Sequence, residues 1–401
     1  MESNSYRQRY LGRKGLIVLL ALLSAFVPLS MDMYLPALPG MATVFDVPVN
    51  LVNLTLILFF VFFAAGILIW GPLSDKYGRK PILLAGLMIY LAASIMCALS
   101  TDIYQLITFR ILQAVGGSAS SVVATAIVKD VYHSRDREKV LAIVQSMVMI
   151  APAVAPVIGA FILSFTTWRG VFWMLASIGF VAFAGSIAYT ETIPRRSDVS
   201  VPGSLGRLGV VLKNPGFTSL LALFSLTSIS TMAFVASSSY VYQIEFGTTE
   251  QVYSYYFALN GIGLIMGPMI YVRLSARFDR NAIIKACFAL IAISGVLVFF
   301  LGPISPIVFA LCVLPATVAG VCSRPPGTSL MLEQQTEDTG SASSLMGCAQ
   351  TVMGATGMLL ISHDWGTGIV HALGIIIVMT GIVTSAGWLY LSGRKFIKMT
   401  E

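Results

Sequence analysis

Charge is what this sequence has least of. Only 11% of its 401 residues are Asp, Glu, Lys or Arg, whereas 57% are hydrophobic. Soluble globular domains carry about 25% charged residues, because charge covers their surface. The composition therefore excludes a soluble protein and predicts one that crosses a membrane many times. The net charge of +7 does not indicate nucleic acid as a partner, because the positions of the cations explain it better.

The usual signatures of enzymes and metal sites are also missing. Three histidines form no HExxH pattern, and Gly116–Ser120 fails GxSxG at its last position. No GxxxxGK[ST] sequence is present, so ATP is not the expected energy source. The five cysteines lie in apolar runs without a CxxC pair. We expect a non-enzyme with no cofactor and no metal.

Long apolar runs are abundant. A helix needs about 20 residues to cross the hydrocarbon core of a bilayer, and twelve runs have about this length. We predict an all-α membrane protein with twelve transmembrane helices at roughly 15–36, 50–72, 81–100, 103–129, 139–164, 169–190, 215–242, 251–273, 282–302, 306–328, 340–362 and 368–392.

The cations predict the orientation. Of the 25 Lys and Arg residues, 23 fall at the two termini or in alternate loops on one side, and only Arg110 and Arg169 do not. Basic residues near span ends stay cytoplasmic. Both termini are therefore expected in the cytoplasm, and the protein in the inner membrane, surrounded by lipid.

The longest connection divides the spans six and six. Residues 191–214 are polar and contain Pro194 and Pro202, which is typical of a linker. We predict an N-terminal six-helix bundle over 1–190 and a C-terminal one over 215–401. Residues 273–280 take the place in the second half that the basic turn at 71–81 takes in the first. Two parallel repeats of six spans are the plan of a large class of transporters.

Two opposite charges fall within predicted spans. Asp32 is the only carboxylate in the first span, and Pro36 is expected to end that helix about four residues, or ~6 Å, beyond it. Arg110 lies about seven residues, ~10 Å, from the outer end of the fourth span. Charges in hydrocarbon are costly, so both are expected to face the bundle interior or a wet cavity. The alternatives are a solvated carboxylate at the interface for Asp32 and a purely structural role for Arg110.

Small residues recur every four positions on several spans. In the fifth span these are Ala151, Ala155 and Gly159, interleaved with prolines that include Pro156, and in the eighth they are Gly263 and Gly267. Such stripes let helix backbones approach closely. We predict that the fifth and eighth spans cross in contact, with Ala155 or Gly159 against Gly263 or Gly267. Ordinary packing within one bundle is the alternative.

A third set mixes aromatic rings and amides on spans expected to face a cavity. Such a lining suits a moderately apolar ligand, although many aromatic residues of membrane proteins face lipid instead. The candidates for a substrate cavity are Tyr34, Phe109, Gln113, Phe234, Tyr240, Tyr256 and Asn260.

Three motifs carry a family resemblance. The segment Gly71-Pro-Leu-Ser-Asp-Lys-Tyr-Gly-Arg-Lys-Pro81 resembles the loop motif of the major facilitator superfamily, and Arg110-Ile-Leu-Gln-Ala-Val-Gly116 resembles the fourth-helix motif of its proton-coupled members. Residues 151–159 resemble the fifth-helix motif of its antiporters. Residues 31–39, 255–260 and 340–347 narrow the resemblance to the bicyclomycin/chloramphenicol-resistance subfamily of drug:proton antiporters. Pro325-Pro-Gly departs from that family's Pro-Asn-Ala.

The resemblance implies a function. A monomer would export a neutral or cationic amphipathic drug in exchange for protons, with Asp32 and Arg110 in the coupling role. The loop residues Gly71, Asp75, Gly78 and Arg79 would form a cytoplasmic gate with Asp130. The same fold exporting a metabolite, such as a sugar or amino-acid derivative, is the rival.

The gate has a physical basis. Exposed N–H groups and the helix dipole favour an anion at a helix N-terminus. We therefore predict that Asp75 lies at the start of the eleventh helix, near Thr339–Ser341, and that Arg79 pairs with Asp130.

Overall fold

A computed structural model describes residues 8, 10–132, 134–193, 201–335 and 339–394. In this part of the chain the regular structure is helical, which confirms the all-α prediction. The elements are α1 (Gly12–Asp32), η2 (Leu35–Ala37), α2 (Leu38–Phe45), α3 (Val49–Tyr77), α4 (Arg79–Leu99), α5 (Ile103–Val131), α6 (Ser134–Leu163), α7 (Trp168–Ala188), α8 (Val201–Leu212), α9 (Pro215–Tyr240), η3 (Val241–Glu245), α10 (Glu250–Leu274), α11 (Arg280–Leu301), η4 (Gly302–Ile304), α12 (Pro306–Cys322), α13 (Arg324–Glu333), α14 (Thr339–Ile361) and α15 (Ile369–Leu391).

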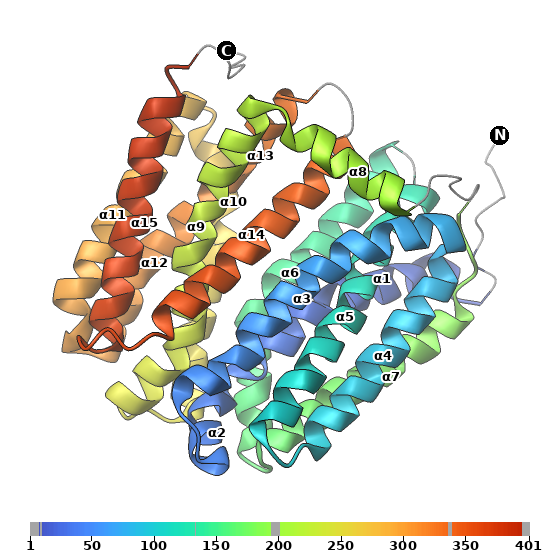
Figure 1. Ribbon diagram of the computed structural model, residues 1–401, viewed down its shortest axis with the longest axis horizontal. Coiled ribbons are helices and arrows are strands. Elements are labelled where there is room, and N and C mark those ends of the chain that lie inside the picture. The colour runs from blue at the N-terminus through green and yellow to red at the C-terminus, as the bar shows by residue number, and fades with distance from the viewer. Residues whose placement is uncertain (1–7, 9, 133, 194–200, 336–338, 395–401) are drawn as a thin grey trace.

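Within the described ranges, twelve helical segments are long and apolar enough to cross a membrane, as the sequence predicts. Helices α1 to α7 form one group and α9 to α15 the other, and Figure 1 shows the two groups side by side. Helix α1 begins and helix α15 ends at the same end of the molecule (Figure 1). We call it the inner end, because the basic residues predict that it faces the cytoplasm, and the opposite end the outer end.

The first span is longer than the sequence indicates. Pro36 does not end it, because this proline occupies the first turn of η2, where a missing N–H group costs no hydrogen bond. After a turn at Met33 and Tyr34 the chain is helical again through η2 and α2, and the whole span covers Gly12–Phe45. Asp32 therefore lies 13 residues, or about 20 Å, before the end of the span rather than near it.

The tenth span is also longer than predicted. It extends to Glu333 through α13, because the backbone hydrogen bonds from Ser323 N to Ala319 O and from Gly327 N to Ser323 O continue the helix past Pro325. Arg324, which the sequence places at the cytoplasmic end of this span, is therefore inside it.

The two bundles meet along two helix pairs, α3 with α14 and α6 with α10. The contact between the fifth and eighth spans is thus confirmed, but the residues differ from those predicted. The closest approach is at Gly261, where a Cβ atom would lie 2.9 Å from Ala153 Cα. Gly159 instead faces α1, with a Cβ position 2.1 Å from the Met33 carbonyl oxygen.

The glycines of the eighth span face their own bundle as well. A Cβ atom on Gly263 would meet Leu314, and one on Gly267 would meet Val321, both of α12. A repeat of four residues identifies a helix face suited to close packing but does not say which neighbour covers it. Here most of the stripe serves packing within a bundle.

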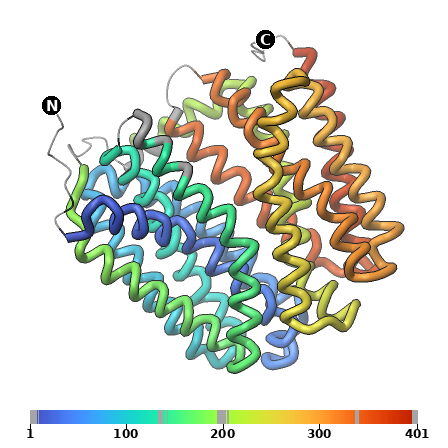
Figure 2. The backbone as a smooth tube through the Cα atoms, turned by 180° about the vertical axis from the view of Figure 1, so that it is seen from behind, coloured from blue at the N-terminus to red at the C-terminus, as the bar shows by residue number. Residues whose placement is uncertain are grey.

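The segment between the bundles contains a helix that the sequence reasoning did not identify. Helix α8 runs across the inner end (Figure 1), and α3, α9 and α14 contact it. Val211 on α8 is buried, and its carbonyl oxygen accepts a hydrogen bond from Gln335 Nε2. Figure 2, seen from behind, shows α1 and α6 on the opposite face of the N-terminal bundle.

Candidate functional site

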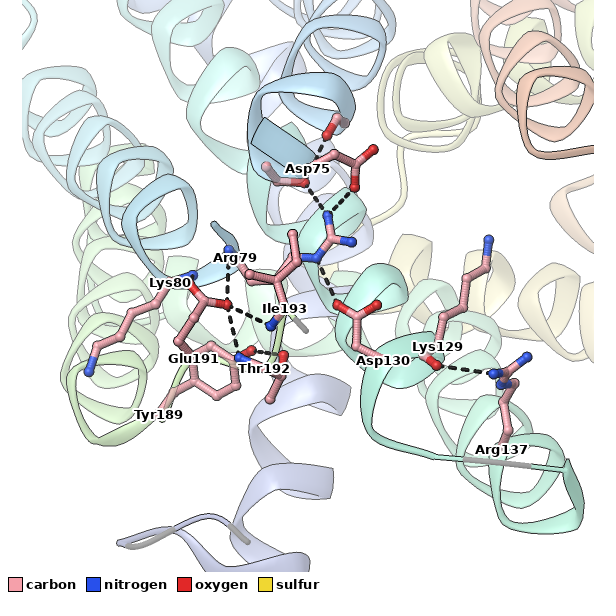
Figure 3. Close-up of polar contacts among 12 residues, drawn as sticks. Asp75, Arg79, Lys80, Lys129, Asp130, Arg137, Tyr189, Glu191, Thr192 and Ile193 are labelled. Atoms are coloured by element: carbon pink, nitrogen blue, oxygen red, sulfur yellow. Dashed lines mark hydrogen bonds and ion pairs between the residues drawn. The ribbon is translucent and has the colours of Figure 1, made fainter. Parts of the chain in front are cut away.

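A network of charged side chains lies at the inner end of the N-terminal bundle. Arg79, the first residue of α4, points between α3 and α5 (Figure 3). Its guanidinium group donates to Asp75 at 2.5 Å, to Asp130 at 2.8 Å and to Ser74 Oγ at 2.7 Å. The predicted pairing of Arg79 with Asp130 is confirmed.

Glu191 completes this network, and the sequence reasoning missed it. Its carboxylate follows the sixth span and accepts hydrogen bonds from the backbone N–H groups of Arg79 and Lys80 at 3.2 and 3.0 Å. It thereby occupies the N-terminus of α4, where the helix dipole favours an anion. The same carboxylate also accepts from the N–H groups of Thr192 and Ile193 (Figure 3). Glu191 thus fixes the start of the interbundle linker to the basic turn.

Gly78 makes this arrangement possible. Its φ angle of +111° is one that L side chains rarely adopt, and a Cβ atom there would lie 2.7 Å from Glu191 Oε2. Next to Glu191, burial raises the pKa of the Tyr189 phenol, which therefore keeps its proton and can donate to Thr192 Oγ1. Gly71 of the same motif lies in α3, and a Cβ atom there would only touch Val122.

The predicted position of Asp75 against the eleventh helix stays a prediction. That helix does begin at Thr339, as expected, but residues 336–338 lie outside the described part of the chain. The Asp75 side chain is 52% exposed and bonds only one of its oxygens to Arg79. It is therefore free to accept a further donor.

Arg110 is fully buried in the N-terminal bundle, within a cage of aromatic rings. Its guanidinium carbon lies 4.3 Å from the ring centre of Phe59, 4.9 Å from that of Tyr34 and 5.9 Å from that of Phe172. Ring faces attract cations, most strongly where water is excluded. In the described part of the chain Arg110 has no carboxylate partner, and its Nε has no hydrogen bond.

Neutral acceptors bind the Nη atoms of this guanidinium group. Arg110 Nη1 donates to Ser30 O at 3.1 Å and to Gln113 Oε1 at 2.7 Å. Gln113 Nε2 in turn donates to Ser94 Oγ at 2.8 Å. Tyr90 joins the network through its hydroxyl group, 2.6 Å from Ser30 Oγ. Gln113 is thus part of the support of Arg110.

Asp32 lies at the same level as Arg110 but on another side of α1. Arg110 contacts Ser30 O and Met31 Sδ, and each further residue turns the helix by about 100°. Asp32 is therefore turned away from Arg110 about the α1 axis, and it lies within electrostatic range of Tyr253 on α10.

Asp32 is only 7% exposed, so the alternative of a solvated carboxylate at the interface is wrong. Among the described residues it makes no hydrogen bond or ion pair. It is a buried carboxyl group close to the boundary between the two bundles.

Four side-chain hydrogen bonds join the bundles at their outer ends. Asn53 of α3 forms two of them, because its Nδ2 donates to Ser362 Oγ at 2.8 Å and its Oδ1 accepts from the Tyr240 hydroxyl at 3.2 Å. The others run from Gln243 Nε2 to Pro36 O at 3.0 Å and from Gln251 Nε2 to Ala160 O at 3.3 Å. The outer ends of the two bundles are therefore joined.

A cavity of about 320 Å³ lies beside these bonds, with walls from both bundles. Of the seven residues predicted to contact substrate, Tyr240 lines this cavity. Its lining is Pro48, Val49, Asn50, Asn53, Ser237, Tyr240, Ile361, Ser362, His363, Asp364, Trp365, Gly368, Ile369 and Ala372.

The other predicted substrate contacts are packed in this conformation. Tyr34 bonds Thr55 through its hydroxyl group, and Phe109 is half-buried against the apolar core. Phe234 stacks on Phe257 with ring centres 5.9 Å apart, and Tyr256 stacks on Tyr242 at 4.9 Å. Their contact with a substrate stays a prediction.

Asn260 makes one of its possible hydrogen bonds. Its Oδ1 accepts from Thr317 Oγ1 at 3.1 Å, whereas its buried Nδ2 has no partner. An amide with an unused donor is available to an acceptor on a ligand.

Comparison with known proteins agrees with this architecture. The family model of the Major Facilitator Superfamily matches residues 20–358. An uncharacterised MFS-type transporter, YdgK of Bacillus subtilis (strain 168), is 30% identical over 392 residues, which is 96% of each chain.

Two relatives have names that refer to drug resistance. A bicyclomycin resistance protein homolog of Haemophilus influenzae is 25% identical over 88% of this chain and 90% of its own length. A chloramphenicol resistance protein of Pseudomonas aeruginosa is 38% identical over 45% of this chain and 43% of its own. Among solved structures, a peptide transporter, POT, in complex with sulfate superposes with a TM-score of 0.77 at 15% identity, covering 98% of both chains. The resemblance noted from the motifs is confirmed.

Proposed function

The chain belongs to the Major Facilitator Superfamily, and from this premise we propose that it exports amphipathic drugs in exchange for protons by alternating access. It is a multi-pass transporter of small molecules in the inner membrane, and it is not an enzyme. The names of its relatives support drugs as the cargo.

The position of Asp32 carries the proposal of proton coupling. A buried carboxyl group without a fixed partner changes its proton affinity when its surroundings change, since burial favours the neutral form and a nearby cation the charged one. Asp32 lies on the boundary between the bundles, one residue along α1 from the Met31 sulfur that Arg110 contacts. A rocking movement of the bundles would alter both its burial and its distance from Arg110.

The two ends of the molecule support alternating access. In the described conformation the outer ends are joined through Asn53 and its neighbours. The charged network of Arg79 belongs to one bundle only and leaves an oxygen of Asp75 unused. We propose that this oxygen meets the N-terminus of α14 when the inner end closes, and that the outer hydrogen bonds break in the same step.

Cells of a drug-susceptible strain provide the first test. Expression of this chain should lower the accumulation of one or more compounds from an antibiotic panel, and an uncoupler should abolish the difference. Export that survives the uncoupler would contradict proton exchange, and export confined to sugars or amino-acid derivatives would favour the rival substrate class.

Proton release from the purified protein tests Asp32 itself. Addition of an exported drug to the detergent-solubilised protein at several pH values should release protons. The variant Asp32→Asn keeps size and hydrogen bonding but cannot titrate, so release should disappear while drug binding persists. Asp46→Asn, at an exposed carboxylate just after the first span, is the matched control. Unchanged release in Asp32→Asn would overturn the assignment.

A further inference from the structure

Arg324 is an isolated cation within the membrane-spanning part of the C-terminal bundle. It begins α13, nine residues before Glu333, which corresponds to about 13 Å along the helix. Glu333 forms an ion pair with Arg280 at 2.6 Å at the inner end, so that end already has its own paired charges. Arg324 is thus well below the surface.

The part of the chain that the structure describes offers the charge of Arg324 no ionic partner. Arg324 Nε is buried without a hydrogen bond, and among the described residues no carboxylate pairs with its guanidinium group. An ionisable side chain at this depth normally pairs with another group or marks a substrate pathway. Arg110, in the N-terminal bundle, is held by a carbonyl, an amide and three rings, whereas no described residue gives half-buried Arg324 equivalent support.

The neighbouring residues show which way this part of the helix faces. The glycines one turn to either side, Gly320 and Gly327, face Thr231 and Phe224 of α9. The stretch of α9 opposite Arg324 offers hydroxyl groups, at Thr227, Ser228 and Ser230, and no carboxylate.

Two turns earlier on the same face, Thr317 bonds Asn260, which leaves the amide Nδ2 of Asn260 unused. Among the described residues, this wall of the C-terminal bundle therefore presents two unused donors and no carboxylate to match the charge of Arg324.

The charges inside the membrane-spanning segments also favour an anionic ligand. At seven or more residues from either end of a span, the described helices hold one carboxylate, Asp32, and two guanidinium groups, Arg110 and Arg324. Their sum is positive, and it becomes more positive when Asp32 takes up a proton.

We propose that Arg324 binds an anionic group of the transported compound, such as a carboxylate, sulfonate or phosphate. The planar guanidinium fork matches these groups with two parallel hydrogen bonds. Asn260 would donate to an acceptor about 10 Å away, since Thr317 and Arg324 are seven residues apart. The inference rests on the proposed export function and changes the expected cargo from neutral or cationic compounds to compounds with an anionic or strongly accepting end.

Binding of two xanthene dyes of similar size but opposite charge tests the inference. Fluorescein is anionic and rhodamine 123 is cationic, and fluorescence polarisation measures the binding of each to the purified full-length protein in detergent. The wild-type protein should prefer fluorescein. Arg324→Gln should weaken fluorescein binding about tenfold or more, as expected for loss of a charge-assisted hydrogen bond, and leave rhodamine 123 binding unchanged or stronger.

Two further variants separate recognition from folding. Arg324→Lys keeps the charge without the fork, so it should retain part of the preference. Arg273→Gln removes an exposed cation at the inner end of α10 and should change neither dye. Absence of fluorescein binding, a wild-type preference for rhodamine 123, or an equal loss of both dyes in Arg324→Gln would each overturn the proposal.

The measurement is independent of the export assay. It uses no proton gradient, so a failure of uncoupler-sensitive export would not alter the dye preference. Conversely, export without any preference for anionic compounds would contradict only the role of Arg324.

Discussion

The hydrogen bonds of Asn53 allow a quantitative prediction about closure of the outer end. Asn53→Ala removes both the bond to Ser362 and the bond from Tyr240. A hydrogen bond between neutral groups contributes about 1 kcal/mol, so the closed arrangement should lose about 2 kcal/mol relative to the open one. This is a shift of about thirtyfold in the equilibrium between them. An open population of about 1% would rise to about a quarter.

Distances between the outer ends measure this shift. Double electron–electron resonance in a cysteine-free background reports the distance between two spin labels at the outer ends. The labels are placed at two exposed positions, Ser164 after α6 and Thr367 before α15. Asn53→Ala should add a population at longer distance. Asn50→Ala is the matched control, because Asn50 lines the same cavity one turn away and is exposed.

Single variants of the partners refine the prediction. Tyr240→Phe and Ser362→Ala each remove one of the two bonds, and each should shift the equilibrium about fivefold. If the distance distribution of Asn53→Ala matched that of Asn50→Ala, the bonds would not hold the outer end closed, and packing of α3 on α14 would have to do so.

Two more predictions concern the bundle contact and the basic turn. Gly261→Ala should hold α6 away from α10 and reduce transport, because its Cβ would lie 2.9 Å from Ala153 Cα. The control Gly347→Ala, where nothing lies within 4 Å of the new Cβ, should leave transport intact. Equal transport in both variants would refute the role of Gly261. Glu191→Ala removes charge-assisted hydrogen bonds to the start of α4 and should lower the free energy of unfolding by about 1–3 kcal/mol. Its melting temperature should therefore be lower than that of the exposed control Glu250→Ala. An unchanged melting temperature would show that Glu191 is dispensable at the N-terminus of α4.

Features set by local sequence could be predicted here. Twelve apolar runs of membrane-spanning length gave the twelve spans, and the pairing of Arg79 with Asp130 followed from a motif. Local reasoning failed where the position of a residue within its helix, or a neighbour in space, decides the outcome. Pro36 is a helix breaker in isolation, but in the first turn of η2 it costs nothing.

The same limit explains the site residues that the sequence did not reveal. Glu191 follows a span and looks like any polar residue of a linker, yet it occupies the N-terminus of a helix 112 residues earlier in the chain. Asn53 became significant only when the fold brought it to Ser362. The depth of Arg324 depended on whether the helix continued past Pro325, which the residue pattern does not decide. An unusual proline pair beside an arginine was the one signal available there.

The outer and inner ends also differ in how they respond to the surroundings of the cell. The hydrogen bonds at the outer end use Asn, Gln, Tyr and Ser side chains and backbone carbonyl groups, none of which changes charge at ordinary pH or is screened by salt. The ionic contacts of Arg79 lie at the end predicted to face the cytoplasm, whose composition the cell regulates. Closure of the outer end therefore depends little on the acidity or salinity of the medium, which a bacterium does not control.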